Sequence, residues 1–329
     1  ELKFTTHRAG MQPYCQDIIE HKIRKLKPDV FGVLLDSFML YPWILNKDFA
    51  PAKSYFWFPS DGGGGLPLGC ENVIRKFDTP VAMSRYAQRQ AKDQYEIKTE
   101  YIPHAVDHKN FKPLTTEEKY AIKKKWGIAD KFVIGTVARN QGRKMLDRTL
   151  RAFALAAPHI PDAVLFLHSD PTDPAGYFDA HYMIHKLGIQ NRVIWSGTKY
   201  YKPFDYNKMN EIYNLMDVFF LGTSGEGFGI PTIEAMSAEI PILTTDYTTA
   251  EELVTRTGSG EVVKKDAEIL GTWNVDRAVM DMQDAADRMI RLRMDASLRE
   301  KYGKKGREAV LEEYTWKTVT ESWNKLINS

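Results

Sequence analysis

From Phe132 onward, short apolar segments alternate with amphipathic ones, and this alternation limits the fold more than any other feature of the chain. We expect strands at 132–137, 163–167, 192–195, 218–221, 241–244 and 260–263, with helices between most of them. Strands separated by helices in this way predict parallel sheets that carry helices on both faces. Ligands of such sheets bind beyond the carboxyl ends of the strands. The loops after these strands are therefore the first places to look for a site.

The first part of the chain is less regular. We expect a helix at 15–27, a buried strand at 30–35, further strands at 55–58 and 79–84, and a glycine-rich loop at 59–65. A charged, lysine-rich stretch at 109–130 is predicted to link two domains, 1–108 and 131–312. From Asp276 to its end the chain is predicted to be helical, with a break at 313–316 and a last helix after it.

The segment from Ser224 to Met236 combines a loop with the start of a helix. It follows the apolar run 218–221 and holds two carboxylates, Glu226 and Glu234, the first expected on the loop and the second in the first helical turn. Glycines let a backbone approach a ligand closely, and the N–H groups at a helix start favour a phosphate. Carboxylates accept hydrogen bonds from sugar hydroxyls. A sugar attached to a diphosphate would suit this segment; a structural turn with two solvated acids is the alternative.

A second candidate segment follows the strand at 132–137. Three cations, Arg139, Arg143 and Lys144, lie in the loop before a helix that is predicted to begin near Leu146. Arginine binds phosphate oxygens as a planar fork and lysine binds them as a point charge. The alternative is a basic loop that only faces solvent.

The segment 224–236 resembles the E-x7-E signature of retaining glycosyltransferases of family 4, which have the GT-B fold. The likeness continues through 241–246 and 251–254, and 81–84 and 102–107 are similar to other landmarks of that family. The resemblance implies an α/β protein with two Rossmann-like domains facing a cleft. It also implies that the segment 313–329 crosses back to the first domain as a helix.

The resemblance assigns roles to the residues named above. It implies that Glu226 faces the donor hexose and that Glu234 binds the ribose hydroxyls. Arg139 and Lys144 would clamp the donor diphosphate, with Arg143 as a third cation, and the region that begins at Gly197 would hold the nucleobase. The main chain around the first glutamate would contact the sugar, at Gly227, Phe228, Gly229 and Ile230.

The chain departs from the family pattern mainly in its first domain. No counterpart of the family's first glycine-rich loop or of its first-domain histidine is visible, and this domain is predicted to be incomplete at its N-terminus. His104 is interpreted as a turn residue. Asp61 follows a predicted strand, so it is a candidate for contact with the acceptor or the donor hexose, and a cap of the glycine turn is the alternative. Met145 and Ala105 stand where the family usually has glycine.

The resemblance therefore implies transfer of a hexosyl group from a UDP-, GDP- or ADP-sugar with retention of anomeric configuration. The acceptor would be a glycan, a lipid or a small molecule, and no cofactor or metal is expected. Glu226, Arg139, Lys144 and Asp61 are the candidate catalytic residues. A sugar-nucleotide-binding protein without turnover, or an epimerase or phosphorylase of the same fold, remains the alternative.

Composition adds limits on partners and location. The formal net charge of +2 argues against nucleic acid as the main partner, and two cysteines provide no disulfide framework. No apolar run approaches the length of a membrane helix, so we expect a cytoplasmic protein. The expected helix at 15–27 carries basic residues beside an apolar stripe. That pattern is compatible with contact at a membrane surface, and packing against the core is the alternative.

Overall fold

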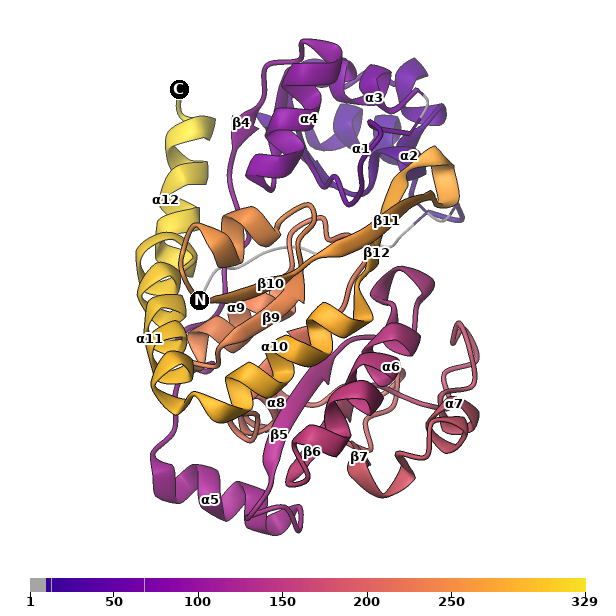
Figure 1. Cartoon of the computed structure of the whole chain (residues 1–329). Helices are drawn as coiled ribbons and strands as arrows, with labels where there is room; N and C mark the ends of the chain where they lie inside the picture. Colours follow the sequence, from indigo (N-terminus) through magenta and orange to yellow (C-terminus); the bar gives the residue numbers. More distant parts are fainter. Residues whose placement is uncertain (1–9, 13, 68) are drawn as a thin grey trace.

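The computed structural model describes residues 10–12, 14–67 and 69–329, which form two α/β units, each around its own parallel sheet (Figure 1). The first sheet has the order β1-β2-β3-β4, and every neighbouring pair in it is parallel. Its strands are β1 (Val30–Leu34), β2 (Lys53–Phe58), β3 (Thr79–Ala82) and β4 (Glu100–Tyr101). Its helices are α1 (Ile19–Leu26), α2 (Ser37–Leu40), α3 (Cys70–Lys76) and α4 (Arg85–Tyr95).

The second sheet has the order β10-β9-β8-β5-β6-β7 and is also parallel throughout. Its strands are β5 (Phe132–Val137), β6 (Ala163–His168), β7 (Val193–Trp195), β8 (Val218–Leu221), β9 (Ile242–Thr245) and β10 (Gly260–Val263). The helices that surround it are α6 (Leu146–Ala156), α7 (Ala180–Lys186), α8 (Tyr206–Asn214), α9 (Ile230–Ser237), α10 (Met282–Met294) and α11 (Ala296–Glu313).

Alternate residues of the central strands supply two separate cores, one on each face of this sheet. Val218 and Phe220 of β8 pack with α6 and α10, whereas Phe219 and Leu221 pack with α8, α9 and α11. Successive side chains of a strand point to opposite faces, so a strand covered on both sides must be apolar throughout. This explains why the second sheet could be predicted from short apolar runs.

Two connections join the units. Helix α5 (Thr116–Lys125) precedes β5 and begins with a capping box between Thr115 and Glu118. The last helix, α12 (Trp316–Ile327), returns to the first sheet, where Trp323 lies 5.5 Å from Trp57 between ring centroids. The expected GT-B-like arrangement with a crossing C-terminal helix is confirmed. The boundaries at 108, 130 and 312 stay predictions, and residues 1–9 of the expected first domain lie outside the described residues.

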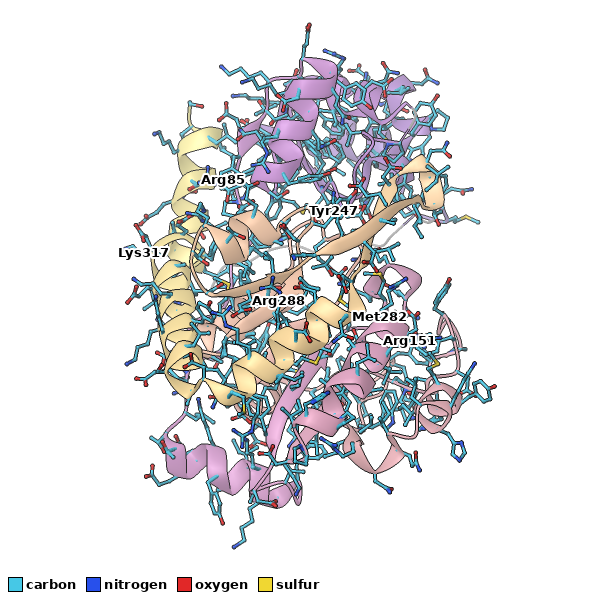
Figure 2. The ribbon with its side chains drawn as sticks, in the orientation of Figure 1. Arg85, Arg151, Tyr247, Met282, Arg288 and Lys317 are labelled. Atoms are coloured by element: carbon cyan, nitrogen blue, oxygen red, sulfur yellow. The ribbon has the colours of Figure 1, made fainter. Side chains whose placement is uncertain are left out.

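Polar contacts hold the two units together as well. Figure 2 shows Arg85 and Tyr247 where the first unit meets the second. The main-chain N–H of Arg85 donates to Glu252 at 2.7 Å, and the hydroxyl of Tyr247 accepts from the N–H of Gly63 at 2.7 Å. The two units are therefore joined by direct hydrogen bonds as well as by the connecting helices.

Four expectations about secondary structure were wrong. Asp276 does not begin a helix: β11 (Lys265–Leu270) and β12 (Asp276–Met280) form an antiparallel hairpin, and α10 starts only at Met282. Every residue of β11 is exposed, so it lacks the apolar run that identifies a strand.

The other three differences are smaller. The strand at Val30 is an edge strand and only partly buried. Helix α1 begins at Ile19, not at Cys15. Glu234 is the fifth residue of α9, beyond the first turn.

Candidate active site

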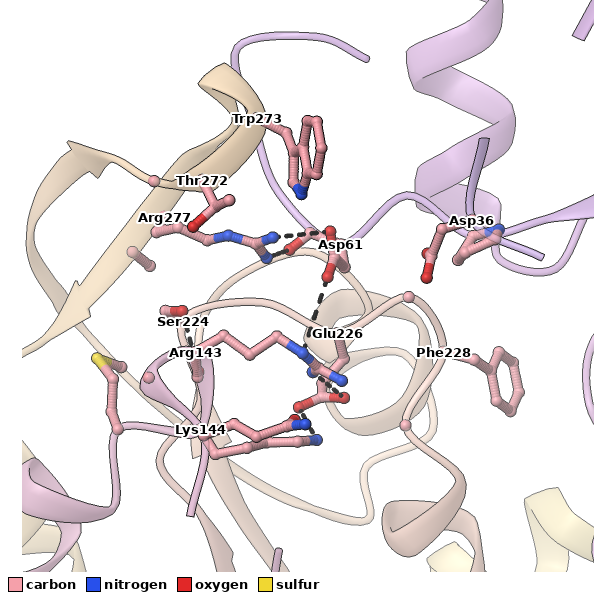
Figure 3. A pocket seen from close by; sticks show the side chains of 18 of the residues that line it. Asp36, Asp61, Arg143, Lys144, Ser224, Glu226, Phe228, Thr272, Trp273 and Arg277 are labelled. Atoms are coloured by element: carbon pink, nitrogen blue, oxygen red, sulfur yellow. Dashed lines mark hydrogen bonds and ion pairs between the residues drawn. The ribbon is translucent and has the colours of Figure 1, made fainter. Parts of the chain in front are cut away.

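A cleft of about 1020 Å³ opens between the two units and contains most of the predicted site (Figure 3). The first unit contributes Asp36, Asp61, Met83 and His104 to its lining. The second unit contributes three main segments, which lie at 141–145, at 224 and 226–231, and at 269–273 in the hairpin, and also Tyr177, Arg277 and Ala278. Each of the first two segments follows a strand of the second sheet, so the cleft lies at the carboxyl ends of those strands, where ligands of such sheets bind.

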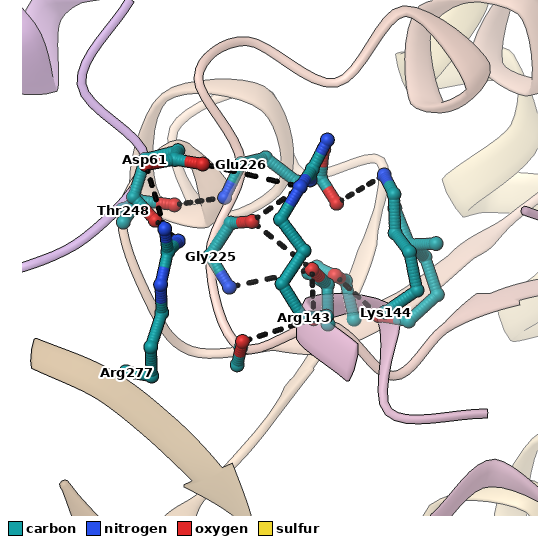
Figure 4. Close-up of polar contacts among 11 residues, drawn as sticks. Asp61, Arg143, Lys144, Gly225, Glu226, Thr248 and Arg277 are labelled. Atoms are coloured by element: carbon teal, nitrogen blue, oxygen red, sulfur yellow. Dashed lines mark hydrogen bonds and ion pairs between the residues drawn. The ribbon is translucent and has the colours of Figure 1, made fainter. Parts of the chain in front are cut away.

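Glu226 lies on the loop after β8, as predicted, and is buried. Its carboxylate accepts from the ammonium of Lys144 at 2.6 Å and from the guanidinium of Arg143 at 3.2 Å (Figure 4). Its main-chain N–H donates to the hydroxyl of Thr248 at 2.9 Å. Burial acts to raise the pKa of Glu226, but the two cations outweigh it and lower the pKa below its usual value. The group is therefore a carboxylate at neutral pH.

The two cations are held by the short turn at Gly142–Lys144, between β5 and α6. The main-chain carbonyl of Arg143 accepts from the N–H of Ser224 at 2.7 Å and from its hydroxyl at 2.9 Å, which ties the cation loop to the glutamate loop. Burial lowers the pKa of Lys144, although Glu226 partly offsets this. The hydrogen bonds between these two loops therefore help to place Arg143 and Lys144 beside Glu226.

The glutamate loop presents a row of unused donors to the cleft. The main-chain N–H groups of Gly227, Phe228, Gly229 and Ile230 donate no hydrogen bond to any residue that the structure describes, and all four residues line the cleft. Gly229 has a φ of 106°, which glycine adopts without strain. Consecutive free N–H groups at the start of a helix form a site for an anion or for sugar oxygens.

Asp61 is held by arginines from the second unit (Figure 4). Its carboxylate accepts from Arg277 of β12 at 3.0 Å and lies 3.9 Å from Arg143, and its main-chain carbonyl also accepts from Arg277. Asp61 therefore does line the cleft, but it also links the two units. Its contact with the acceptor or the donor hexose stays a prediction.

Arg139 lines a second pocket, of about 380 Å³, next to the cleft. Its guanidinium is paired with Asp173, with one contact at 3.0 Å. The two cavities share Lys144 and Pro231, so the second pocket continues from the cleft. Gly197 is not among the described residues that line it, but the three residues that follow, 198–200, are.

Glu234 is separated from the other predicted residues. It lines neither the cleft nor the second pocket among the residues that the structure describes, and its carboxylate accepts from the hydroxyl of Tyr213 at 2.6 Å. Burial raises the pKa of Glu234 to about 7, and the hydrogen bond from Tyr213 opposes this shift. Its contact with ribose stays a prediction, because the structure does not bring it to either cavity wall.

Sequence reasoning missed three parts of the cleft wall. Asp36 lies two residues after the end of β1, so the rule about the carboxyl ends of strands could have found it. His104 was interpreted as a turn residue, and its ring does pack 4.4 Å from Trp57 and 5.3 Å from Phe228 between centroids, yet it also lines the cleft. Burial lowers the pKa of His104 to about 4, so it is neutral at pH 7. The hairpin was missed because no strand was predicted at 265–270 and its second strand, from Asp276 onward, was expected to be helical.

Chemically, the cleft can bind an anion and orient a polyhydroxylated ligand. Two cations and a row of N–H groups surround one buried carboxylate, and water is partly excluded, which strengthens each of these interactions. Within residues 10–12, 14–67 and 69–329, no three His, Cys, Asp or Glu side chains are grouped as a metal site requires. In the same ranges, no helix is long and apolar enough to span a bilayer. The expectation of a reaction without metal stays a prediction.

Residues 118–309 match the protein family described as Glycosyl transferases group 1. The lipopolysaccharide core biosynthesis mannosyltransferase LpsB of Rhizobium meliloti (strain 1021) is 27% identical over 220 residues, which cover 66% of this chain and 59% of the relative. The GDP-mannose-dependent monoacylated alpha-(1-6)-phosphatidylinositol monomannoside mannosyltransferase of Corynebacterium glutamicum is 26% identical over 281 residues. That match covers 81% of this chain and 67% of the relative.

Among solved structures, the sucrose-phosphate synthase of Thermosynechococcus elongatus superposes with a TM-score of 0.75. The superposition covers 95% of this chain and 76% of that one, at 16% sequence identity. At this level of identity the likeness concerns the fold, which in both is the pair of facing α/β units described above.

Proposed function

The chain belongs to the group 1 family of glycosyl transferases, and from this premise we propose that it transfers a hexosyl group from a nucleotide diphosphate sugar to an acceptor with retention of configuration. The chain spans 59% of the length of the mannosyltransferase LpsB, so the activity of the whole protein is part of the proposal. The observation that carries it is the grouping of Glu226, Lys144 and Arg143 beside four free N–H groups in the cleft.

The two connected cavities suggest how the donor would lie. We place the nucleoside in the second pocket, near Arg139 and residues 198–200, because Lys144 and Pro231 join that pocket to the cleft. The diphosphate would then lie at Lys144, and the hexose would lie against residues 226–230. Lys144 and Arg143 are paired with Glu226. Phosphate oxygens would take over part of that pairing and leave the carboxylate free for a sugar hydroxyl.

The proposed reaction breaks the bond between C1 of the hexose and the oxygen of the β-phosphate. The electron pair of that bond stays on the diphosphate, where Lys144, Arg143 and the N–H groups of the glutamate loop stabilise the added charge. An acceptor hydroxyl forms the new bond to C1 on the same face, and its proton passes to the departing phosphate oxygen. In this scheme the protein supplies position and charge, and no side chain has to act as a nucleophile.

The acceptor would enter from the side of the first unit, which contributes Asp36, Asp61 and His104 to the cleft. We also propose weak contact with anionic membranes through α1 and the residue after it. Arg24, Lys25 and Lys27 are exposed there, and Leu26 is 50% exposed. The apolar residue Ile23 is buried in the core, so this contact would depend mainly on charge.

The test begins with the donor. Thermal shifts would be measured with UDP, GDP, ADP and their hexose conjugates, with GDP-mannose included first because one relative is named as dependent on it. A ligand at 100 times its Kd stabilises the folded state by about 2.7 kcal/mol, which a melting curve resolves. The absence of any nucleotide shift would refute the proposal.

The second step separates binding from chemistry. Glu226→Gln keeps the size of the side chain but removes the charge that positions the hexose and balances Lys144. We expect it to keep nucleotide binding and to lose about 100-fold or more in transfer, while Glu300→Gln, an exposed glutamate on α11, behaves as wild type. The anomeric proton signal of the product reports retention or inversion. Donor binding without transfer to any acceptor would favour the accessory protein, and donor conversion without an acceptor would favour an epimerase or hydrolase.

A further inference from the structure

The β11–β12 hairpin belongs to the second unit but reaches the first one (Figure 1). The glycine run at 62–65 receives it: Gly63 and Asp276 exchange two main-chain hydrogen bonds, at 2.9 and 3.0 Å. A Cβ atom at Gly62 would lie 2.2 Å from Val275, and one at Gly64 would lie 2.4 Å from the carboxylate of Asp276. The glycine run therefore allows the hairpin to pack directly on the backbone of the first unit.

This docking places the hairpin tip in the wall of the cleft. Residues 269–273 line the cleft together with Asp36 and Phe38 of the first unit. Figure 3 shows Thr272 and Trp273 on the other side of the pocket from Glu226 and Lys144. Arg277, at the base of the tip, holds Asp61 at 3.0 Å. The tip thus has a fixed position above the place proposed for the donor hexose.

Trp273 is the most unusual residue of the tip. One face of its indole stacks on Phe38, with centroids 4.8 Å apart and planes inclined by 20°, yet the residue remains 56% exposed and lines the cleft. Its φ of 65° lies in the left-handed region, which a bulky residue rarely adopts. Backbone strain of this kind clusters at ligand sites and persists where the surrounding structure enforces it, here in the hairpin turn that also holds Asn274 at a φ of 59°. An exposed indole stacked on Phe38 at a cleft wall is a platform for a flat ligand face.

Asp36 lies two residues before Phe38, on which Trp273 stacks, and Figure 3 shows its side chain at the same pocket. Its carboxylate accepts no hydrogen bond from any residue that the structure describes, although it is partly buried. Burial and the nearby charge of Asp61 raise its pKa. A desolvated acceptor without a partner gains free energy when a ligand donates to it. An indole face and an open carboxylate together suit one chemical class: a sugar ring, whose C–H groups meet the aromatic face while its hydroxyls donate to the acid.

We propose that Trp273 and Asp36 form the acceptor subsite, and that the acceptor presents a sugar ring there rather than an acyl chain or a small acid. This rests on the proposed transferase function and adds the class of its acceptor. The hairpin then determines acceptor choice, because it carries the aromatic face while the donor is held by loops after β5 and β8.

The direct test uses saturation-transfer NMR with methyl α-D-mannopyranoside, methyl α-D-glucopyranoside and methyl β-D-galactopyranoside, and with glycerol as a non-sugar comparison. Aromatic protons of the protein are saturated in the presence of the nucleotide that gives the largest thermal shift. We expect transfer to the ring C–H protons of at least one glycoside and none to glycerol. Trp273→Ala should reduce this transfer severalfold, whereas Trp273→Phe should keep most of it.

Trp316→Ala is the matched control, because Trp316 is 60% exposed on α12 and does not line the cleft. In steady-state assays, Trp273→Ala and Asp36→Asn should raise KM for a sugar acceptor about tenfold or more. The KM for the donor should change less than twofold. This split is expected only if the two residues contact the acceptor.

Three outcomes would overturn the proposal while leaving the transferase function intact: nucleotide shifts without saturation of any glycoside, equal saturation in wild type and Trp273→Ala, or an equal loss of donor and acceptor affinity. Loss of binding to phosphatidylserine vesicles in Trp273→Ala, with glycoside contact unchanged, would assign the tip to a membrane surface and also overturn it. Failure of the nucleotide shifts themselves would instead refute the transferase function.

Discussion

Glu234 is expected to make the stability of this protein fall as the pH rises through neutrality, and Glu234→Gln should remove that effect. Burial raises the pKa of Glu234 from 4.5 to about 7, while Tyr213 donates to it at 2.6 Å. A carboxyl group whose pKa is higher in the folded state binds more protons there than in the unfolded chain. Its contribution to stability is therefore complete below about pH 4.5 and is lost as the pH rises through about 7.

The size of the effect follows from the two pKa values. Their difference of about 2.5, at 1.36 kcal/mol per pKa unit, corresponds to about 3 kcal/mol in total. Between pH 5 and pH 8.5, roughly 2–3 kcal/mol of this should disappear. The partly buried histidines His104 and His168, whose pKa values are lowered to about 4, act in the opposite direction between pH 4 and pH 6.5. The wild-type curve alone would therefore mix both effects.

The assay is urea unfolding at pH 5 and pH 8.5 for wild type, Glu234→Gln and the exposed control Glu300→Gln. For each pH, the free energy of unfolding of wild type is subtracted from that of Glu234→Gln. We expect this difference to be about 2–3 kcal/mol larger at pH 8.5 than at pH 5. The histidines are present in both proteins, so their contribution cancels in this comparison. Equal pH dependence in wild type and Glu234→Gln would refute the reasoning that burial controls this carboxyl group.

The other predictions concern the cleft, the loops around it and the membrane surface. In urea unfolding, Gly225→Ala should destabilise the protein by about 2 kcal/mol more than the control Gly258→Ala. Both glycines have positive φ, but only at Gly225 would an added Cβ clash, at 1.9 Å from the carbonyl oxygen of Asp61. Lys144→Met should weaken binding of the nucleoside diphosphate at least tenfold in calorimetry and leave binding of the nucleoside unchanged, and equal losses for both ligands would argue against a phosphate contact. A double variant, Arg24→Gln with Lys25→Gln, should lose about 2 kcal/mol of binding free energy for phosphatidylserine vesicles in co-sedimentation and none for neutral vesicles. Unchanged binding would exclude a contribution from α1.

The second unit could be predicted well because its strands are buried on both faces. Runs such as 218–221 are apolar at every position, so they stand out without any knowledge of neighbouring strands. The cations and the first glutamate were also found, since each follows such a strand and its role depends on local chain geometry. Lys144 pairs with Glu226 at 2.6 Å across two loops that are distant in sequence. The family resemblance assigned both residues to the donor but did not predict this pair.

The hairpin and the first unit were harder to predict for a physical reason. Strand β11 is exposed at every residue, and its stability depends on pairing with β12 and on docking against the glycine run. The sequence near β11 indicates neither its pairing with β12 nor its docking on the glycine run, which was recognised only as a loop. Trp273 and Arg277 therefore could not be assigned to the cleft. Glu234 illustrates a different limit, because its position in a helix can be predicted, but its separation from both cavities and its hydrogen bond from Tyr213 cannot.

The return of α12 to the first sheet has a consequence for biosynthesis. Val319, Trp323 and Leu326 pack in one cluster with Tyr55, Val81 and Ile102, residues that are made more than two hundred positions earlier. A ribosome therefore releases the first unit long before the residues that cover this face of its sheet exist. That face must stay exposed, or be shielded by a chaperone, until residues 316–327 have been translated. Loss of residues 316–327 would then damage a unit that is made well before them.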